Sequence, residues 1–410
     1  MLDNLKFAQY VNEERKKLIK STRERGVYIE DNATLSEVVA RNSEIQPYEA
    51  TSTDKISVTF LDADGTLLKR EYLDIGGTAT APSNPTLDSD YLTFSGWSDT
   101  ELTNITESKI IYATYTTKDN ATYIFIHIPT ANIAISLSFG GTITSVDWGD
   151  GTTDATKSHT YSAFGDYVIK VIGGTSISSY ILGTSNNNKY VLKCYFSNAI
   201  ASLGNYAFYY CYSLISIILP SSITSIGRSA LTHCYSLKSI LLPNTIKSMD
   251  DSSLDNCVSL TSVTLPNSLT RLGENIFSNC YNLKSIFLPN TITKIGIAIL
   301  NNCYSLTSVT LPNSLTSLPR SSLVNCYSLT SVTLPNSLTS LDTYAIGNCY
   351  NLKQVIINAD SVVTIQSDSF SDYTYNTKFY VPDNLVEDYK VATNWVNFAD
   401  RIYPLSSLGV

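Results

Sequence analysis

Apolar side chains recur at a step of 23 residues through the second half of the chain, as in CYSLTSVTLPNSLTSLPRSSLVN at residues 303–325. Leu-x-x-Val-x-Leu alternates apolar and polar positions, which predicts a short strand with one buried face. Pro-Asn or Pro-Ser then predicts a turn, because Pro presets φ and Asn tolerates unusual backbone angles. Ser-Leu-Thr-Ser-Leu predicts a second extended stretch, and RSSLVN predicts a helical turn that carries one more core residue.

This period and its leucine spacing are typical of leucine-rich repeats. No unit can bury its apolar face alone, so we expect the units to stack into a solenoid over residues 190–375. A one-residue slip near Ala359 and Asp372 in place of a cysteine mark the last coil. Residues 376–410 are predicted to cap the final apolar edge, with a short helix at Leu385–Thr393.

Seven cysteines keep the same step and fall at one equivalent point of each coil. They are Cys211, Cys234, Cys257, Cys280, Cys303, Cys326 and Cys349. Neighbouring coils lie about 4.8 Å apart, a distance that disulfides could bridge. We favour a ladder of small buried hydrophobic side chains, because a zinc site needs a C-x₂₋₄-C cluster, which is absent here. Cys194 is off register and is assigned to the entry cap.

The repeat region resembles the BspA-like leucine-rich repeats of bacterial and phage surface proteins. Its units match the pattern Leu-x-x-Ile/Val-x-Leu-Pro, then Ile/Leu-x-x-Ile/Leu, then a Leu/Phe-x-x-Cys turn. The family usually has Ala-Phe before x-x-Cys. Residues 207–208 keep that pair, whereas residues 230–231 and 322–323 vary it.

The strand face of the solenoid is predicted to be flat, uncharged and rich in hydroxyl groups. Its outward positions are the candidate ligand-binding residues, and the alternative is a solvated surface with no ligand. These residues are Ser262, Thr264, Ser285, Phe287, Ser308, Thr310, Ser331 and Thr333. A tyrosine ladder follows the cysteines and is broken by Val258. We interpret it as a seal of the coil in preference to a sugar-stacking strip.

Residues 55–117 contain LDADGTLL, which matches the D-x-D-G-T start of haloacid dehalogenase phosphatases. The following LLKREYLDI reads as a strand, and GGTATAPSNP cannot be helical, so a hairpin is favoured over a phosphatase. Asp62 and Asp64 are accordingly predicted to be turn residues exposed to water. The module resembles an internalin-B-type repeat, which implies a β-grasp-like fold, through Val58-Thr59-Phe60, Gly76-Gly77 and Phe94-Ser95-Gly96-Trp97.

Residues 119–174 resemble a PKD domain, which implies a small immunoglobulin-like sandwich. The matching segments are Val146 to Thr152 (VDWGDGT), His159-Thr160-Tyr161 and Gly165 to Val171 (GDYVIKV). Asp147, Asp150 and Asp154 could hold calcium, but we favour local capping of tight turns. The three histidines, His127, His159 and His233, are assigned structural roles because no nucleophile or base recurs beside them.

Residues 1–45 are predicted to form short amphipathic helices that need a partner surface. Their apolar side chains are the predicted virion-docking residues Leu5, Phe7, Val11, Leu18, Leu35 and Val38. This segment resembles the leaders of phage virion proteins, which implies docking on capsid or other virion proteins. Helices of this size also suggest a homo-oligomeric base.

Charged residues make up only 16% of the chain, and the net charge is −8. These values argue against nucleic-acid binding, because there is no basic patch to release counterions. The start of the chain lacks an apolar signal sequence, and no run reaches the length of a membrane helix. No metal or other cofactor is predicted.

The sequence thus predicts a multidomain, mainly β, non-enzymatic protein with a helical leader, two small β modules and a capped solenoid. We expect a bacteriophage head fibre or capsid decoration, assembled in the host cytoplasm, that binds host-surface or mucosal glycans or proteins. The alternatives are a tail-associated receptor-binding protein and a bacterial cell-surface adhesin. An adhesin would need a secretion signal.

Overall fold

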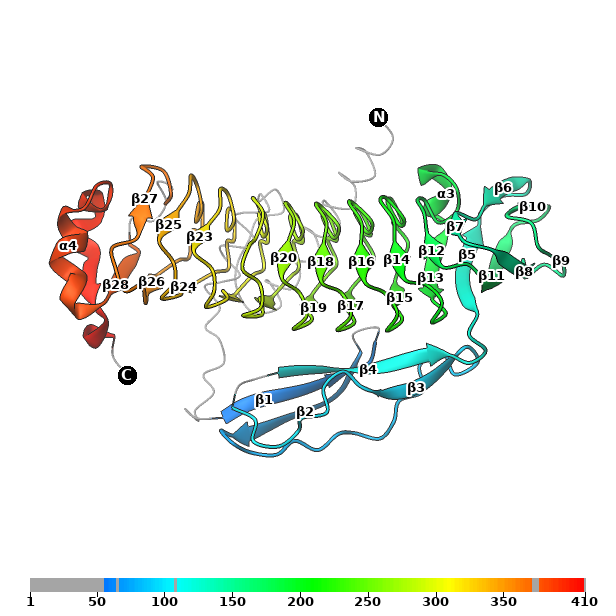
Figure 1. Cartoon of the computed structure of the whole chain (residues 1–410), viewed down its shortest axis with the longest axis horizontal. Coiled ribbons are helices and arrows are strands. Elements are labelled where there is room, and N and C mark those ends of the chain that lie inside the picture. The colour runs from blue at the N-terminus through cyan, green and yellow to red at the C-terminus, as the bar shows by residue number, and fades with distance from the viewer. Residues whose placement is uncertain (1–54, 64–65, 107–108, 371–375, 409–410) are drawn as a thin grey trace, which may run out of the picture.

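The computed structural model describes residues 55–63, 66–106, 109–370 and 376–408. A long solenoid extends from a group of strands at one end to a helical cap at the other, and a separate sheet lies along one side (Figure 1). The mainly β class and the C-terminal solenoid with a period of about 23 residues are confirmed. The predicted helical leader, residues 1–45, lies outside the described residues.

The first module is a four-stranded mixed sheet in the order β2-β1-β4-β3. Its strands are β1 (Lys55–Leu61), β2 (Leu67–Asp74), β3 (Leu92–Trp97) and β4 (Lys109–Thr117). Strand β1 pairs antiparallel with β2 and parallel with β4. The D-x-D-G-T segment therefore leads into a second strand, which confirms the predicted hairpin and leaves no place for the helix of a dehalogenase-type fold.

The second module is continuous with the solenoid. Its strands are β5 (Thr122–Ile128), β6 (Ile133–Ser136), β7 (Phe139–Gly140), β8 (Ile143–Asp147), β9 (Thr153–Asp154), β10 (Ser158–Tyr161) and β11 (Gly165–Gly173). Strand β5 pairs with β13 (Val191–Tyr195), and β7 pairs with β12 (Ser176–Ile177). Both β12 and β13 belong to the solenoid. One buried apolar cluster runs from Ile124 through every coil to Ile402. This module thus covers the first coil and shares its core.

Two ladders of short parallel strands run along the solenoid. The first contains β13 (Val191–Tyr195), β15 (Ser216–Ile218), β17 (Ser239–Leu241), β19 (Ser262–Thr264), β21 (Ser285–Phe287), β22 (Ser308–Thr310), β24 (Ser331–Leu334) and β26 (Gln354–Ile357). The second contains β12 (Ser176–Ile177), β14 (Ser202–Leu203), β16 (Ser225–Ile226), β18 (Ser248–Met249), β20 (Arg271–Leu272), β23 (Ser317–Leu318), β25 (Ser340–Leu341) and β27 (Thr364–Ile365). Ser317 faces Ser340 at the usual step, whereas Ser340 faces Thr364 one residue later, which confirms the slip near Ala359.

The turn that joins each second strand to the next cysteine is not helical, so that part of the sequence prediction was wrong. In residues 320–325, Ser321 and Asn325 have left-handed φ values of 56° and 59°. The amide of Asn325 donates to the Gly347 carbonyl of the next coil, and that of Leu323 donates to Ala345. Backbone hydrogen bonds therefore run between coils, where a helix would keep them within one turn.

The C-terminal end continues the first ladder before it covers it. Strands β28 (Lys378–Val381) and β29 (Ile402–Pro404) pair in parallel beyond β26. The helix α4 (Val386–Val391) lies within the predicted range, and Tyr389 and Trp395 bury their rings against the last coil. The other helical turns of the described residues are α3 (Ser185–Asn188), η1 (Asp383–Leu385), η2 (Trp395–Arg401) and η3 (Leu405–Ser407).

Candidate functional site

The first strand ladder of the solenoid presents an uncharged face over the coils of β21, β22 and β24. Along β21 and β22 the burial alternates, so that Ile286 and Val309 point into the core while their neighbours point outward. We define the open strand face as Ser285, Phe287, Ser308, Thr310, Ser331 and Thr333. Five of these six side chains are exposed, and Ser331 is half-buried. The predicted outward orientation is therefore confirmed in these coils.

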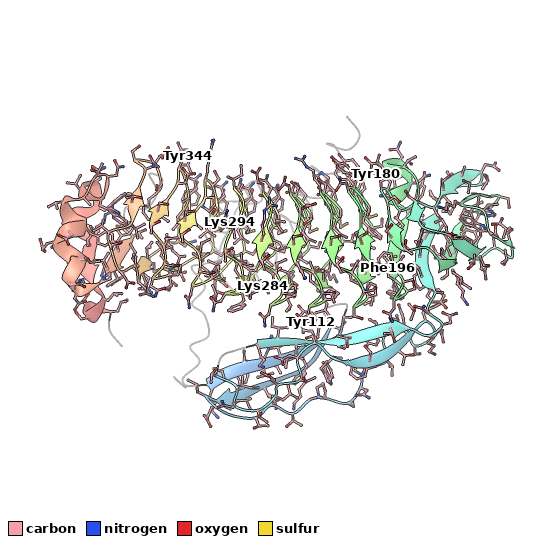
Figure 2. All side chains as sticks on the ribbon, in the orientation of Figure 1. Tyr112, Tyr180, Phe196, Lys284, Lys294 and Tyr344 are labelled. Carbon is pink, nitrogen blue, oxygen red and sulfur yellow. The ribbon has the colours of Figure 1, made fainter. Side chains whose placement is uncertain are left out.

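The same face is covered over the preceding coils. We define the covered strand face as Ser216, Ile218, Ser239, Leu241, Ser262 and Thr264. The sheet of β1 to β4 lies along this side of the solenoid, with Tyr112 between the two (Figure 2). Ser216 and Ser239 are buried, and Ser262 and Thr264 are half-buried. Ser262 and Thr264, which were predicted to bind a ligand, thus lie beneath this module.

Aromatic packing and a few polar contacts hold the module in place. Tyr115 and Ala113 of β4 join a buried cluster with Tyr195 and Ile218 of the solenoid. The Tyr112 hydroxyl lies 2.9 Å from the Ser262 hydroxyl. Burial raises the pKa of Tyr112, so this phenol stays neutral.

Asp88 is the charged anchor of the same interface. Its carboxylate accepts a 2.7 Å hydrogen bond from the Lys193 ammonium and another from the Tyr195 hydroxyl. Partial burial raises the pKa of Asp88, but the bonds from Lys193 and Tyr195 outweigh it and hold the pKa below its usual value. The carboxylate therefore stays charged at neutral pH.

Asp62 differs from its prediction as a water-exposed turn residue. It is only 6% exposed, and its carboxylate accepts hydrogen bonds from the Tyr115 hydroxyl at 2.7 Å and from the Ala63 amide at 2.8 Å. The hairpin end is buried because it reaches the solenoid, where the Ser239 hydroxyl lies 3.5 Å from the Ala63 carbonyl. Asp62 fixes a turn at an interface. Asp64 lies outside the described residues.

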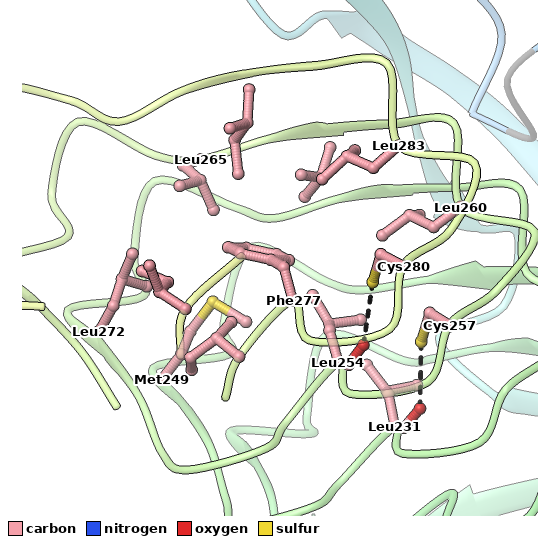
Figure 3. Packing of buried hydrophobic residues seen from close by; sticks show 14 of the residues in the cluster. Leu231, Met249, Leu254, Cys257, Leu260, Leu265, Leu272, Phe277, Cys280 and Leu283 are labelled. Carbon is pink, nitrogen blue, oxygen red and sulfur yellow. Dashed lines mark hydrogen bonds between the residues drawn. The ribbon is translucent and has the colours of Figure 1, made fainter. Parts of the chain in front are cut away.

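The cysteine ladder is fully buried, and all eight thiols are free. From Cys234 onward each thiol donates to a carbonyl of the preceding coil, as Cys257 does to Leu231 at 3.3 Å and Cys280 to Leu254 at 3.4 Å (Figure 3). Burial raises the pKa of Cys280 well above that of an ordinary thiol. The prediction of small hydrophobic side chains, in preference to disulfides, is confirmed.

The tyrosine ladder has little ring face to offer a ligand. The rings of Tyr281, Tyr304, Tyr327 and Tyr350 stack at centroid distances of 4.7, 4.9 and 5.0 Å. Their interplanar angles are 5°, 6° and 14°, so each inner ring has both of its faces covered by its neighbours. Burial raises the pKa of Tyr327 to about 12, so the phenol stays neutral. This geometry favours a seal over a sugar-stacking strip, because sugars stack on free ring faces.

A ladder of asparagine side chains runs beside the tyrosine ladder. Asn302 donates to Asn279, Asn325 donates to Asn302, and Asn348 donates to Asn325, at 2.7 to 3.0 Å. Each of these residues has a left-handed backbone, which asparagine adopts more readily than most residues. This column therefore joins the turns of neighbouring coils.

The acidic residues of the second module cap turns, which confirms the favoured prediction. Asp147 accepts from the Gly149 amide, Asp150 from the Thr152 amide, and Asp154 from the Thr156 amide, at 2.8 to 3.1 Å. His159 bonds to Asp150 and stacks on Trp148 at 4.9 Å. The side chain of His127 pairs with Asp166, and that of His233 with Tyr235.

An aromatic cluster lies over the first two coils, and the sequence predicted only two of its members, Tyr212 and Tyr235, as part of the tyrosine ladder. We define the N-terminal aromatic cluster as Tyr180, Tyr206, Tyr209, Tyr210, Tyr212, His233 and Tyr235. Tyr180 lies on the edge of the solenoid away from the first module (Figure 2). The sequence signal for the cluster is the four tyrosines within residues 206–212, three of which lie outside the 23-residue tyrosine ladder.

Within the described ranges, no group of three or more metal-binding side chains lies together. The same ranges hold no helix of the length and apolarity that a membrane crossing needs. The predicted virion-docking residues, Leu5 to Val38, fall outside the described residues.

The ladders, the buried leucine core and the parallel coils together define a leucine-rich repeat solenoid. Residues 201–327 and 294–392 match the family model for the BspA type leucine rich repeat region, with six copies. The chain therefore carries a BspA-type leucine-rich repeat region, as its resemblance to that family predicted.

Several solved structures are also similar. A leucine rich repeat protein of T. pallidum is 27% identical over 46% of this chain and 75% of its own, with a TM-score of 0.32. A leucine rich cell surface protein from Faecalibacterium prausnitzii is 20% identical over 52% and 85%, with a TM-score of 0.24. The pneumococcal vaccine antigen PcpA is 17% identical over 50% and 64%, with a TM-score of 0.29. Comparison with the curated proteins gives no match.

Proposed function

We propose that this protein is a non-enzymatic adhesive protein that binds its partner through the open strand face. The carrying observation is the contrast between the two halves of one face. The first module covers the coils of β15, β17 and β19, while Phe287 and Thr310 in later coils are exposed on a regular, uncharged surface. Such a surface provides many weak contacts over an extended partner, and it has no acid or base for bond cleavage.

Phe287 is the apolar centre of this surface. Its ring is 45% exposed, whereas Ser285 and Ser308 beside it offer hydroxyl groups. Aromatic residues, phenylalanine among them, are enriched in the centres of protein interfaces relative to the rest of the surface. Lys284 lies at the edge of the same strand and is also exposed (Figure 2).

We favour the bacterial cell-surface form of this proposal, which the sequence offered as an alternative. The family match lies in the BspA-type repeats, and these are the part of the chain that the proposal uses. The expected head fibre, the tail-associated role and the homo-oligomeric base all depend on residues 1–45. These roles stay predictions. They would be contradicted if a chain lacking residues 1–45 were still incorporated into phage particles.

The binding proposal is tested with the full chain on mucin-coated surfaces, by surface plasmon resonance. Thr310→Arg places a long charged side chain on the open strand face and should weaken binding by about tenfold or more. Thr293→Arg makes the same change at an exposed position beside the second ladder and should leave binding unchanged. Equal binding by the native chain and Thr310→Arg, or no binding by the native chain, would overturn the proposal for this ligand.

A further inference from the structure

The N-terminal aromatic cluster forms an unbroken series of ring contacts. Measured between ring centroids, Tyr180 stacks with Tyr206 at 6.0 Å, Tyr206 contacts Tyr209 at 5.5 Å, and Tyr209 contacts Tyr210 at 4.1 Å. Tyr210 lies 4.8 Å from His233 and 5.3 Å from Tyr212, which stacks on Tyr235 at 4.8 Å. These seven rings span the entry turn and the first two coils. Several of their contacts are tilted or edge-to-face, such as Tyr206 on Tyr209 at 84°, whereas the inner rings of the distal tyrosine ladder lie parallel at 5° and 6°.

The backbone beneath this cluster is unfavourable for aromatic residues. Tyr206, Tyr210 and His233 have φ values of 63°, 64° and 63°, and Tyr180 has 28°. Bulky residues rarely adopt this left-handed region, which costs of the order of a factor of ten in stability per residue. At the position of Tyr210 and His233, the five later coils carry asparagine. Asparagine would suit the turn and extend the asparagine ladder, so the fold does not explain these rings.

The cluster is accessible and borders a hollow. Tyr206 is 36% exposed, and Tyr209, Tyr210 and His233 are partly exposed. A cavity of about 220 Å³ is lined by Lys189, Tyr212, Ser213 and Tyr235. Its lining combines ring surfaces with hydroxyl groups and one ammonium group. The Asp255 carboxyl group, in the following coil, is half-buried and accepts a hydrogen bond from Asn279.

This chemistry suits an uncharged saccharide. A pyranose ring has apolar C–H faces and a rim of hydroxyl groups, and tyrosine offers an apolar ring with a polar tip. Small-molecule sites likewise combine ring surfaces with a few fixed polar groups. A protein partner would need a larger apolar centre, whereas Tyr206 is the cluster's one member among the exposed large hydrophobic residues of the described chain.

We propose that the N-terminal aromatic cluster is a binding site for a neutral polysaccharide, with one sugar unit in the cavity beside Tyr212 and Tyr235. Further units lie over Tyr209 and Tyr210. The site is separate from the open strand face, and it rests on the proposed function only in that the chain is a binding protein. Lys189 and Ser213 donate hydrogen bonds to the sugar hydroxyl groups.

The experiment is affinity electrophoresis of the full chain in gels that contain soluble β-glucan, mannan or galactan, with a hyaluronan gel for comparison. At least one neutral polysaccharide should retard the native chain. The double variant Tyr210→Asn with His233→Asn should bind about tenfold more weakly or worse. It should unfold at the same temperature as the native chain or higher, because it restores asparagine at two left-handed positions. Tyr209→Thr, which copies Thr232 of the next coil, should weaken binding as well.

Two control variants separate this site from the others. Tyr304→Val copies Val258 in the distal tyrosine ladder and should bind like the native chain, as should Thr310→Arg on the open strand face. Loss of binding in Thr310→Arg alone would assign the polysaccharide to that face and overturn this inference. Native mobility in all three neutral gels, retardation by hyaluronan alone, or equal retardation of the double variant would also overturn it.

Discussion

The burial of single residues in this protein depends on their contacts with neighbouring coils. Sequence spacing alone placed the seven regular cysteines at one point of the coil, and their burial followed from the stacking of apolar units. Asp62 could not be placed in this way. Its burial depends on a contact between Ala63 and Ser239, which are far apart in the sequence, and no local pattern encodes that contact.

The buried thiols predict a loss of stability in alkaline solution. Burial raises the pKa of Cys280 and Cys303 in the folded chain, whereas an unfolded thiol ionises near pH 8.5. Above that pH the unfolded state releases protons that the folded state retains, so stability is intact below about pH 8.5 and falls as pH rises. Each thiol contributes at most about 1.4 kcal/mol per pH unit.

Thermal unfolding between pH 7 and pH 9.5 measures this effect. The midpoint should stay level to about pH 8 and then fall, and Cys280→Ala should fall less steeply. Thiol reagents should react with the eight cysteines only after denaturant is added. A level midpoint to pH 9.5, or rapid modification of the folded chain, would show that the ladder is open to solvent.

At the scale of the element, the repeat predicted both strands of each coil but misjudged the turn that joins the second strand to the next cysteine. The pattern of residues 320–325, one apolar residue among polar ones, resembles that of a helix. In the structure, however, the amides of Ser321, Leu323 and Asn325 donate to carbonyl groups of the next coil. The cause lies in the stack, because a neighbouring coil offers carbonyl groups at every turn. A single unit read alone contains no such partner.

Asn302 tests how this turn is stabilised. Its side chain donates to Asn279 and accepts from Asn325, and its φ is 61°. Asn302→Ala should lower the free energy of unfolding by about 2 kcal/mol, because both bonds and a favourable left-handed residue are lost. Asn302→Gly keeps the backbone preference and should cost only about 1 kcal/mol.

Urea unfolding of the two variants gives the comparison. The difference between alanine and glycine isolates the backbone contribution, and the glycine variant isolates the side-chain bonds. Equal stability of Asn302→Ala and the native chain would mean that the asparagine ladder does not stabilise the turns.

At the scale of the whole molecule, the sequence divided the chain into modules but did not show how they join. The second module shares sheets and core with the solenoid through β5 and β13, and the first module rests on the strand face. Residues at both junctions, such as Tyr115 and Ile126, are apolar strand residues that an isolated module would also bury in its own core. Their sequence pattern therefore does not reveal the contact with the solenoid. The sequence predicted which residues of the strand ladder point outward. It did not predict that the first module covers half of them.

Asp88→Asn tests the junction of the first module. Loss of the carboxylate removes the ion pair with Lys193 and weakens the bond with Tyr195, so the module should open more often. Hydrogen exchange should become about tenfold or more faster in β15, β17 and β19, with no change in β22 and β24. Asp74→Asn, at an exposed site of the same sheet, is the matched control.

Exchange that speeds up equally in all coils would indicate general destabilisation. Unchanged exchange in β15 to β19 would mean that the aromatic cluster around Tyr195 holds the module without the ion pair.

The even register of the later coils has an evolutionary consequence. A duplicated stretch of 23 residues inserted after residue 303 would keep every ladder in phase, because Ser285, Ser308 and Ser331 already occupy equivalent positions. The area beneath the first module would not change, since its anchors lie in earlier coils. Unequal recombination between copies could therefore lengthen or shorten the footprint offered to a partner, while the rest of the molecule keeps its architecture.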